Sequence, residues 1–355
     1  MQVFFMSLAD DLKKIKVEAD PQITDLRKAL LNAQKQLAKV KDRDQQLGEL
    51  VFQAAYDATL SMGAIQPVPK PTLAKGKAKA EVALVHATDW QGSKITTSYN
   101  SEVMKKRVMQ FAEKAVKITE IQRHDHPVND VVIMFGGDMI EGLFNYGAQL
   151  WEVDATLFEQ WDVVSFLMVD FVRYFLANFD KVTVVAEWGN HGRIGSKRDH
   201  VPKNDNFDRM CYQFARKLLA GEKRLTWEDC PEDIQRVYIP DPTGKGLGYR
   251  ALLMHGDEVG RAGFASPSAW QAAGNRWKAG AYKWDFSDIY LGHYHRTASE
   301  PLSAQDGMIY WTGSIESDNR YARDSMAVSG VPSQRLHFVD PVKGRVTAQY
   351  QVWLD

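Results

Sequence analysis

The chain has few cysteines, no long apolar run and almost no net charge. Two of its 355 residues are cysteine, too few for a disulfide framework or a cysteine-based zinc site, so we expect a reducing compartment. No stretch approaches the roughly 20 apolar residues of a membrane span, and residues 3–6 lack the basic flank of a signal peptide, so we expect no membrane association. The net charge of −1 excludes a strongly basic body that coats nucleic acid, and any attraction to polyanions is therefore local.

What is present divides into three parts. Behind Asp20 and Pro21, a typical helix start, apolar residues recur at spacings of three and four up to residue 54. This pattern predicts a helix, and leaves open a coiled coil that forms a homo-oligomer or a helix folded onto its own domain. Residues 65–80 hold three prolines, four lysines and no acidic residue, which predicts a stiff, basic linker, either a solvated tether or a contact for a nucleic-acid backbone. We expect a helical extension over residues 1–64, this linker, and a main domain over residues 81–355.

The main domain alternates buried apolar runs with helical stretches, which predicts an α/β fold. Buried strands are expected at residues 82–87, 131–135, 182–186, 251–254 and 289–291. Helices are expected at residues 102–121 and 157–177, and further strands at 308–312, 334–339 and 345–353.

Polar residues and glycines follow each of the five buried strands. Ligands in open α/β sheets collect at the carboxyl ends of strands, so the five loops are expected to form one site. The donors are carboxylates, an amide and imidazoles, which suit Mn²⁺, Zn²⁺ or Fe²⁺ without any cysteine. These candidate ligands are Asp89, Asp138, Asn190, His255, His293 and His295.

In order and context the loops resemble the signature of the calcineurin-like metallophosphoesterases, which reads Asp-x-His, Gly-Asp, Gly-Asn-His, His and Gly-His-x-His. The resemblance runs from about residue 81 to the end of the chain, and implies a two-sheet α/β sandwich with a two-metal site. Mn²⁺ is the expected ion, with Zn²⁺, Fe²⁺ and Mg²⁺ as alternatives. The resemblance implies that Asp138 bridges the two ions. Asp89 and His295 would bind the first ion, and Asn190, His255 and His293 the second. His191 would lie beside the scissile phosphate.

Two positions depart from the family pattern. Gln91 stands where the family has a metal-binding histidine, so it either ligates through its amide oxygen or leaves the first ion loosely held. Glu141 stands where the DNA-repair nucleases of the family carry a histidine, and is expected either to orient a ligand or the nucleophilic water, or to be a surface-loop acid. The mechanism implied is attack by a hydroxide between two ions roughly 3.5–4 Å apart, with Asp138, Asn190 and His191 as catalytic residues.

Two segments bear on the substrate. The loop at residues 192–203 places Arg193, Lys197 and Arg198 beside the expected phosphate, either as phosphate-binding cations or as a salt-bridged surface loop. Trp270, Trp277 and Trp284 alternate with basic residues, which suits base stacking, but their spacing of seven puts them on one helical stripe. Such a stripe favours a core position for most of them, with the lysines and Arg276 exposed.

The basic linker and loop favour a polynucleotide substrate and resemble the nuclease branch of the family, which includes bacteriophage proteins. Our first hypothesis is a metal-dependent DNA exonuclease or other nuclease. The second is a phosphatase or phosphodiesterase that acts on nucleotides or phosphoproteins. The third is a non-catalytic binding or assembly protein on a degenerate phosphoesterase scaffold, which Gln91 keeps open.

Overall fold

A computed structural model describes residues 65–73, 75–76, 79–143, 145, 149–194, 203, 205–228, 234–259, 265–303, 306–319 and 330–355. The predicted helical extension and its coiled coil over residues 20–54 lie outside these residues, as do Lys197 and Arg198. None of the helices in the described part is both long enough and apolar enough to cross a membrane.

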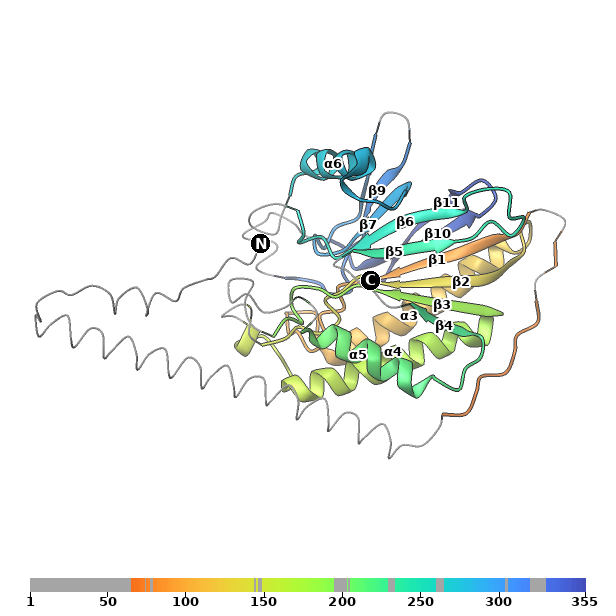
Figure 1. The fold of residues 1–355 in the computed structure, drawn as a ribbon. Coiled ribbons are helices and arrows are strands. Elements are labelled where there is room, and N and C mark those ends of the chain that lie inside the picture. Colours follow the sequence, from red (N-terminus) through yellow and green to blue (C-terminus); the bar gives the residue numbers. More distant parts are fainter. Residues whose placement is uncertain are drawn as a thin grey trace, which may run out of the picture. The chain divides into compact units, whose positions relative to one another are not determined.

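Two β-sheets pack face to face, with helices on the outer faces (Figure 1). The first has the strand order β11-β10-β1-β2-β3-β4, and the second has the order β5-β6-β7-β9-β8. The strands of the first sheet are β1 (Glu81–Ala87), β2 (Val128–Phe135), β3 (Lys181–Ala186), β4 (Leu225–Glu228), β10 (Ser333–Asp340) and β11 (Arg345–Trp353). Those of the second are β5 (Gln235–Ile239), β6 (Tyr249–Met254), β7 (Asp288–Leu291), β8 (Ala298–Pro301) and β9 (Met308–Trp311).

Helices cover the outer face of each sheet (Figure 1). On the first sheet they are α3 (Ser101–Gln122), α4 (Leu157–Asn178) and α5 (Phe207–Leu218). The second carries α6 (Pro267–Arg276), which continues into the π-helical turn η3 (Trp277–Ala281). A short 3₁₀ turn, η1 (Gln149–Trp151), precedes α4. The expected α/β sandwich is confirmed, and the eight strands and the two helices predicted at residues 102–121 and 157–177 are present.

The direction of the strands places the site. β1, β2 and β3 are mutually parallel neighbours in the first sheet, and β6 and β7 are parallel neighbours in the second. Leu84, Val132 and Leu253 belong to the apolar cluster that joins the sheets. The loops that follow these five strands therefore lie at one end of the sandwich, as the strand pattern predicts.

The expected tryptophan stripe is only partly right. Trp270 is fully buried on α6, and Trp277 and Trp284 are half-buried and pack against the same cluster, which confirms the core interpretation. One helix does not carry all three, because Gly280 in η3 has a φ of 111° and the chain is extended at the next residue but one. A positive φ of this size suits glycine and ends the helix before Trp284.

The segment after residue 64 is not simply a solvated tether. The Arg224 guanidinium donates to the carbonyl of Val68 at 3.0 Å, and the Val68 amide donates to Glu222 at 2.6 Å. Arg173 donates to the carbonyl of Gln66 at 2.9 Å. A proline-stiffened chain exposes carbonyls that arginines can bind, so this part of the predicted linker lies against the domain.

A buried carboxyl group in β7 couples stability to pH. Asp288 accepts the Tyr249 hydroxyl at 2.7 Å and the Met308 amide at 2.8 Å. Burial raises the pKa of Asp288 from 3.8 to about 6, although the Tyr249 hydrogen bond opposes the shift. At pH values between 3.8 and about 6, the Asp288 carboxyl group is ionised in the unfolded chain and protonated in the folded protein. This group therefore lowers the free energy of unfolding as the pH rises from about 4 to above 6.

We expect Asp288→Asn to remove this contribution. Relative to the wild type, the free energy of unfolding of the variant should rise by about 2 to 3 kcal/mol between pH 4 and pH 7. Urea unfolding at both pH values measures it. Asp285→Asn is the control, because the Asp285 side chain is 72% exposed. A pH dependence unchanged by Asp288→Asn would contradict the assignment.

Candidate functional site

A left-handed backbone conformation distinguishes most of the candidate site residues. In the described part of the chain, seven residues other than glycine have a positive φ: Asp89, Gln91, Ser93, Asp138, His293, His295 and Asp318. Five of the seven are residues for which the sequence predicts metal binding. A left-handed backbone at a non-glycine residue costs roughly 1–3 kcal/mol and persists where function requires it. The loops therefore hold a strained backbone conformation that directs these side chains toward one another.

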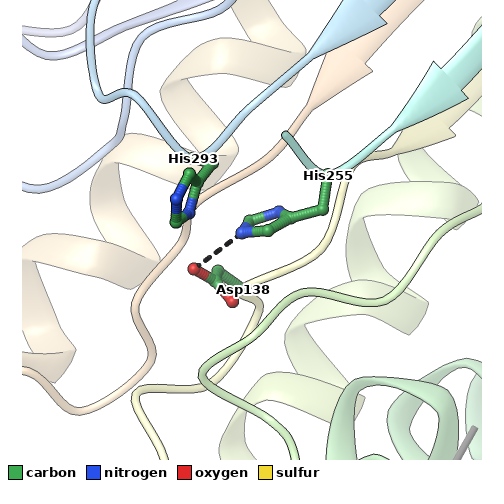
Figure 2. Close-up of side chains that lie close together, drawn as sticks. All are labelled: Asp138, His255 and His293. Atoms are coloured by element: carbon green, nitrogen blue, oxygen red, sulfur yellow. Dashed lines mark ion pairs between the residues drawn. The ribbon is translucent and has the colours of Figure 1, made fainter. Parts of the chain in front are cut away.

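The first ligand group is Asp138, His255 and His293, whose ligand atoms all lie within 4.8 Å of one another (Figure 2). His255 Nε2 is 3.0 Å from Asp138 Oδ2 and 2.9 Å from Asn190 Oδ1. The other ring nitrogen, Nδ1, lies 2.8 Å from the carbonyl oxygen of Gly136. A proton on Nδ1 satisfies that carbonyl, and it turns Nε2 toward the two oxygens.

The Asp138 and Asn190 oxygens around His255 Nε2 favour a positive charge there. Burial lowers the pKa of His255, but the Asp138 carboxylate outweighs burial and raises it to about 10. Burial and the charge on His255 lower the pKa of His293 to about 3, so His293 is neutral, as a metal ligand must be. A divalent cation held by Asp138, Asn190, His255 and His293 would supply the positive charge that the cluster favours. The donor set therefore fits a metal ion.

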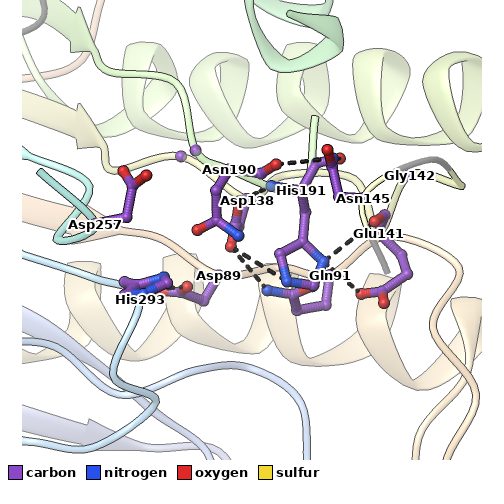
Figure 3. Close-up of polar contacts among 12 residues, drawn as sticks. Asp89, Gln91, Asp138, Glu141, Gly142, Asn145, Asn190, His191, Asp257 and His293 are labelled. Carbon is purple, nitrogen blue, oxygen red and sulfur yellow. Dashed lines mark hydrogen bonds and ion pairs between the residues drawn. The ribbon is translucent and has the colours of Figure 1, made fainter. Parts of the chain in front are cut away.

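The second ligand group is Asp89, Gln91 and His295. His295 Nε2 is 3.3 Å from Asp89 Oδ1, and the Gln91 amide nitrogen is 3.4 Å from His295 Nε2. That same amide nitrogen is 3.3 Å from Asp138 Oδ2, so the two groups meet at Asp138 (Figure 3). On its far side, His295 Nδ1 lies 2.5 Å from the Glu316 carboxylate, which fixes the ring and points Nε2 at the other ligands.

His191 faces the ligand groups without belonging to either. Its Nε2 is 3.8 Å from Asp138 Oδ2, and its Nδ1 is 3.2 Å from Glu141 Oε2 (Figure 3). The His191 amide donates to Asp138 Oδ1 at 2.8 Å. Burial lowers the pKa of His191, but Asp138 and Glu141 outweigh it and raise the pKa. The protonated form is favoured, and it can donate a proton or stabilise negative charge.

Sequence reasoning missed a carboxylate that ties two loops together. Asp208, at the start of α5, accepts backbone amides of the loop after β2 and of the loop after β3. The donors are Asp138 at 2.8 Å, Met139 at 3.0 Å, Ile140 at 3.3 Å and Gly189 at 2.9 Å. Its position marks it as a helix-start residue, and no pattern in the sequence connects it to the site. Glu316 was also missed, although it follows β9 much as the ligands follow their own strands.

The glycines expected beside the ligands are needed for close approach. A Cβ at Gly189 would clash with Asp138 Oδ1, and one at Gly292 would clash with Thr88 Oγ1 and Asp89 Oδ2. Any side chain at either position would displace a ligand carboxylate.

No family model matches the chain, and no curated protein matches it. Similar solved structures include Vps29 from Entamoeba histolytica complexed with Zn²⁺, 11% identical with a TM-score of 0.34 over 77% of this chain and 99% of that one. They also include a putative 5′-nucleotidase from Staphylococcus aureus in complex with alpha-ketoglutarate, 11% identical with a TM-score of 0.34 over 78% of this chain and 54% of that one. A predicted phosphoesterase from Streptococcus pneumoniae is 11% identical, with a TM-score of 0.29 over 77% and 99%.

The strand order matches what the sequence motifs imply. The chain has the two-sheet α/β arrangement expected from the resemblance to the calcineurin-like metallophosphoesterases, with the five loops at one end. As in the family signature, the ligands come from loops after β1, β2, β3, β6 and β7. The Gln91 amide, at the position where the family pattern has a histidine, is fully buried between Asp138 and His295. Its Oε1 has no hydrogen-bond partner among the described residues, so a half-turn of the amide would present this oxygen to a cation.

Glu141, the second departure from the metallophosphoesterase pattern, is not a surface-loop acid. It is 1% exposed and lies against His191, with Lys94 Nζ 3.1 Å from its other oxygen. It therefore orients the histidine that faces the ligand groups.

The two described cations of the loop after β3, Arg193 and Lys203, are ion-paired. Arg193 donates to Asp257 at 2.7 Å, and Lys203 lies 3.0 Å from Glu258. Both carboxylates belong to the loop after β6, so these pairs join the two loops. Among the described residues, Arg193 is in a salt bridge beside the site, and its binding of phosphate stays a prediction.

Proposed function

We propose that this protein is a dinuclear-metal-dependent phosphodiesterase whose substrate is DNA. The observation that carries the proposal is that two ligand groups share the carboxylate of Asp138. A shared carboxylate between two sets of oxygen and imidazole donors suits a pair of divalent cations, with Mn²⁺ expected first. The first group is Asp138, Asn190, His255 and His293, and the second is Asp138, Asp89, Gln91 and His295.

The residues around the metal ligands suit phosphoester hydrolysis. Bound divalent cations would neutralise phosphoryl oxygens and lower the pKa of a water molecule. His191 presents Nε2 to the space beside Asp138, while Glu141 holds its Nδ1 side. A protonated imidazole there stabilises the charge that develops on the phosphoryl group, or protonates the leaving oxygen.

An exposed tryptophan beside His191 supports a nucleic-acid substrate. Trp151 is 86% exposed, and the adjacent Leu150 is 59% exposed. They end the η1 turn, whose first residue, Gln149, contacts His191 Nδ1 at 3.2 Å and the Glu141 carbonyl at 2.6 Å. Gln149 thus holds the η1 turn against His191, and the Trp151 indole does not pack into the core. Nucleobases stack on such rings.

We expect Trp151→Ala to weaken DNA hydrolysis selectively. Loss of one stacking partner should lower kcat/KM on an oligonucleotide by roughly tenfold to a hundredfold. An oligonucleotide with abasic sites around the scissile bond should be cut equally by both proteins, because it has no base to stack. Trp353→Ala, at an exposed tryptophan at the end of β11, is the matched control. Equal losses on both oligonucleotides would contradict a stacking role.

The proposed function is tested with metal-stripped protein to which Mn²⁺, Mg²⁺ or Zn²⁺ is returned. End-labelled single- and double-stranded DNA, a bis-nitrophenyl phosphodiester and a nitrophenyl monoester are assayed in parallel. Asp138→Asn, purified in the same way, reports contaminating nuclease.

Metal-dependent shortening of DNA supports the proposal. Cleavage of the small esters with DNA intact would instead support a phosphatase or phosphodiesterase with a small substrate. Inactivity with every metal, together with retained DNA or protein binding, would support an assembly protein on a phosphoesterase scaffold.

A further inference from the structure

A buried lysine lies behind the site and is not a ligand of it. Lys94, in the loop after β1, is 6% exposed, although lysine is almost never buried without a partner. Its backbone is fixed by a hydrogen bond from its amide to the carbonyl of Gln91 at 2.9 Å and by a bridge to Val153. Its Nζ lies 3.1 Å from Glu141 Oε1.

The buried Glu141 carboxylate links this ammonium group to a site histidine. Glu141, 1% exposed, lies 3.1 Å from Lys94 Nζ through one oxygen and 3.2 Å from His191 Nδ1 through the other. Burial lowers the pKa of Lys94, but Glu141 and then Glu316 outweigh it and raise the pKa above its usual value.

A carboxylate held in a low-dielectric interior needs a positively charged partner within hydrogen-bond distance. A lysine on the loop of Asp89 and Gln91 meets this need and ties that loop to the loop of Glu141. Removing it would let the Glu141 side chain turn away from His191.

We propose that Lys94 is a positioning residue that holds the Glu141 carboxylate in place, and thereby orients His191. This proposal depends on the proposed function only where its test measures the rate of phosphodiester hydrolysis. Partners that orient such histidines typically change activity or metal affinity by 10- to 100-fold when mutated.

The test compares Lys94→Met, Glu141→Gln and the double variant in the full-length protein. Lys94→Met should lower kcat on the phosphodiester by roughly 10- to 100-fold with little change in KM. The double variant should lose no more than Glu141→Gln alone, because Lys94 acts on His191 through Glu141. The double variant removes one positive and one negative charge and leaves no unpaired buried carboxylate at residue 141. If Lys94→Met does not fold, the double variant can therefore still be compared with Glu141→Gln. Lys105→Met, at an exposed lysine of α3, is the control.

A second readout does not depend on activity. In metal-free protein, the imidazole ¹⁵N resonances of His191 should shift in Lys94→Met and stay in place in Lys105→Met. Unchanged resonances, or additive losses in the double variant, would overturn the proposal. If the wild type proved inactive on every ester, the proposed function would fail while the resonances still tested Lys94.

Discussion

Asp138→Asn is expected to lower kcat on a phosphodiester by about a thousandfold or more. The Asp138 carboxylate contacts both ligand sets, at 3.0 Å from His255 and 3.3 Å from Gln91. Cation-based charge stabilisation contributes several kcal/mol, and each 1.4 kcal/mol is a tenfold change in rate. Asn keeps the size of the side chain and one oxygen while it removes the charge. It also tolerates the φ of 52° at this position better than Ala does, so the loop keeps its shape.

The same substitution should weaken metal binding, which calorimetric titration of the metal-free protein measures. Circular dichroism should show an unchanged fold, because the Asp208 carboxylate still accepts the backbone amide of residue 138. Asp125→Asn, at a side chain that is 85% exposed, is the control and should match the wild type. A variant with full activity and unaltered metal binding would remove Asp138 from the site.

The convergence of the candidate ligands could be predicted from the sequence because a single rule locates them. Asp89 and His293 are more than 200 residues apart, yet each directly follows an apolar strand, and parallel strands end at the same edge. The amide of His293 donates to both carboxylate oxygens of Asp89 at 3.0 Å, as this rule requires. Strand bounds were predictable for the same reason, since buried strands are nearly continuous apolar runs.

The residues behind the ligands could not be predicted in this way. Lys94, Asp208 and Glu316 act through contacts between loops, and each looks like an ordinary polar residue in its own segment. Whether Glu141 is a surface acid or a buried partner depends on which side of its loop faces His191, and no periodic pattern encodes that. The helical stripe fails at Trp284 because one glycine conformation in η3 ends the helix, a local event that a spacing of seven does not reveal.

His191→Ala is expected to separate substrates by their leaving groups. If His191 protonates the leaving oxygen, DNA hydrolysis should fall by roughly 10²- to 10⁴-fold, because an alkoxide needs that proton. Hydrolysis of the bis-nitrophenyl ester should fall by less than about tenfold, because nitrophenolate leaves without one. The backbone amide at residue 191 still donates to Asp138, and the side chain binds no cation in the proposed site. Metal affinity should therefore be unchanged. Equal losses on both substrates would instead assign His191 to stabilising charge on the phosphoryl oxygens, since that interaction does not depend on the leaving group.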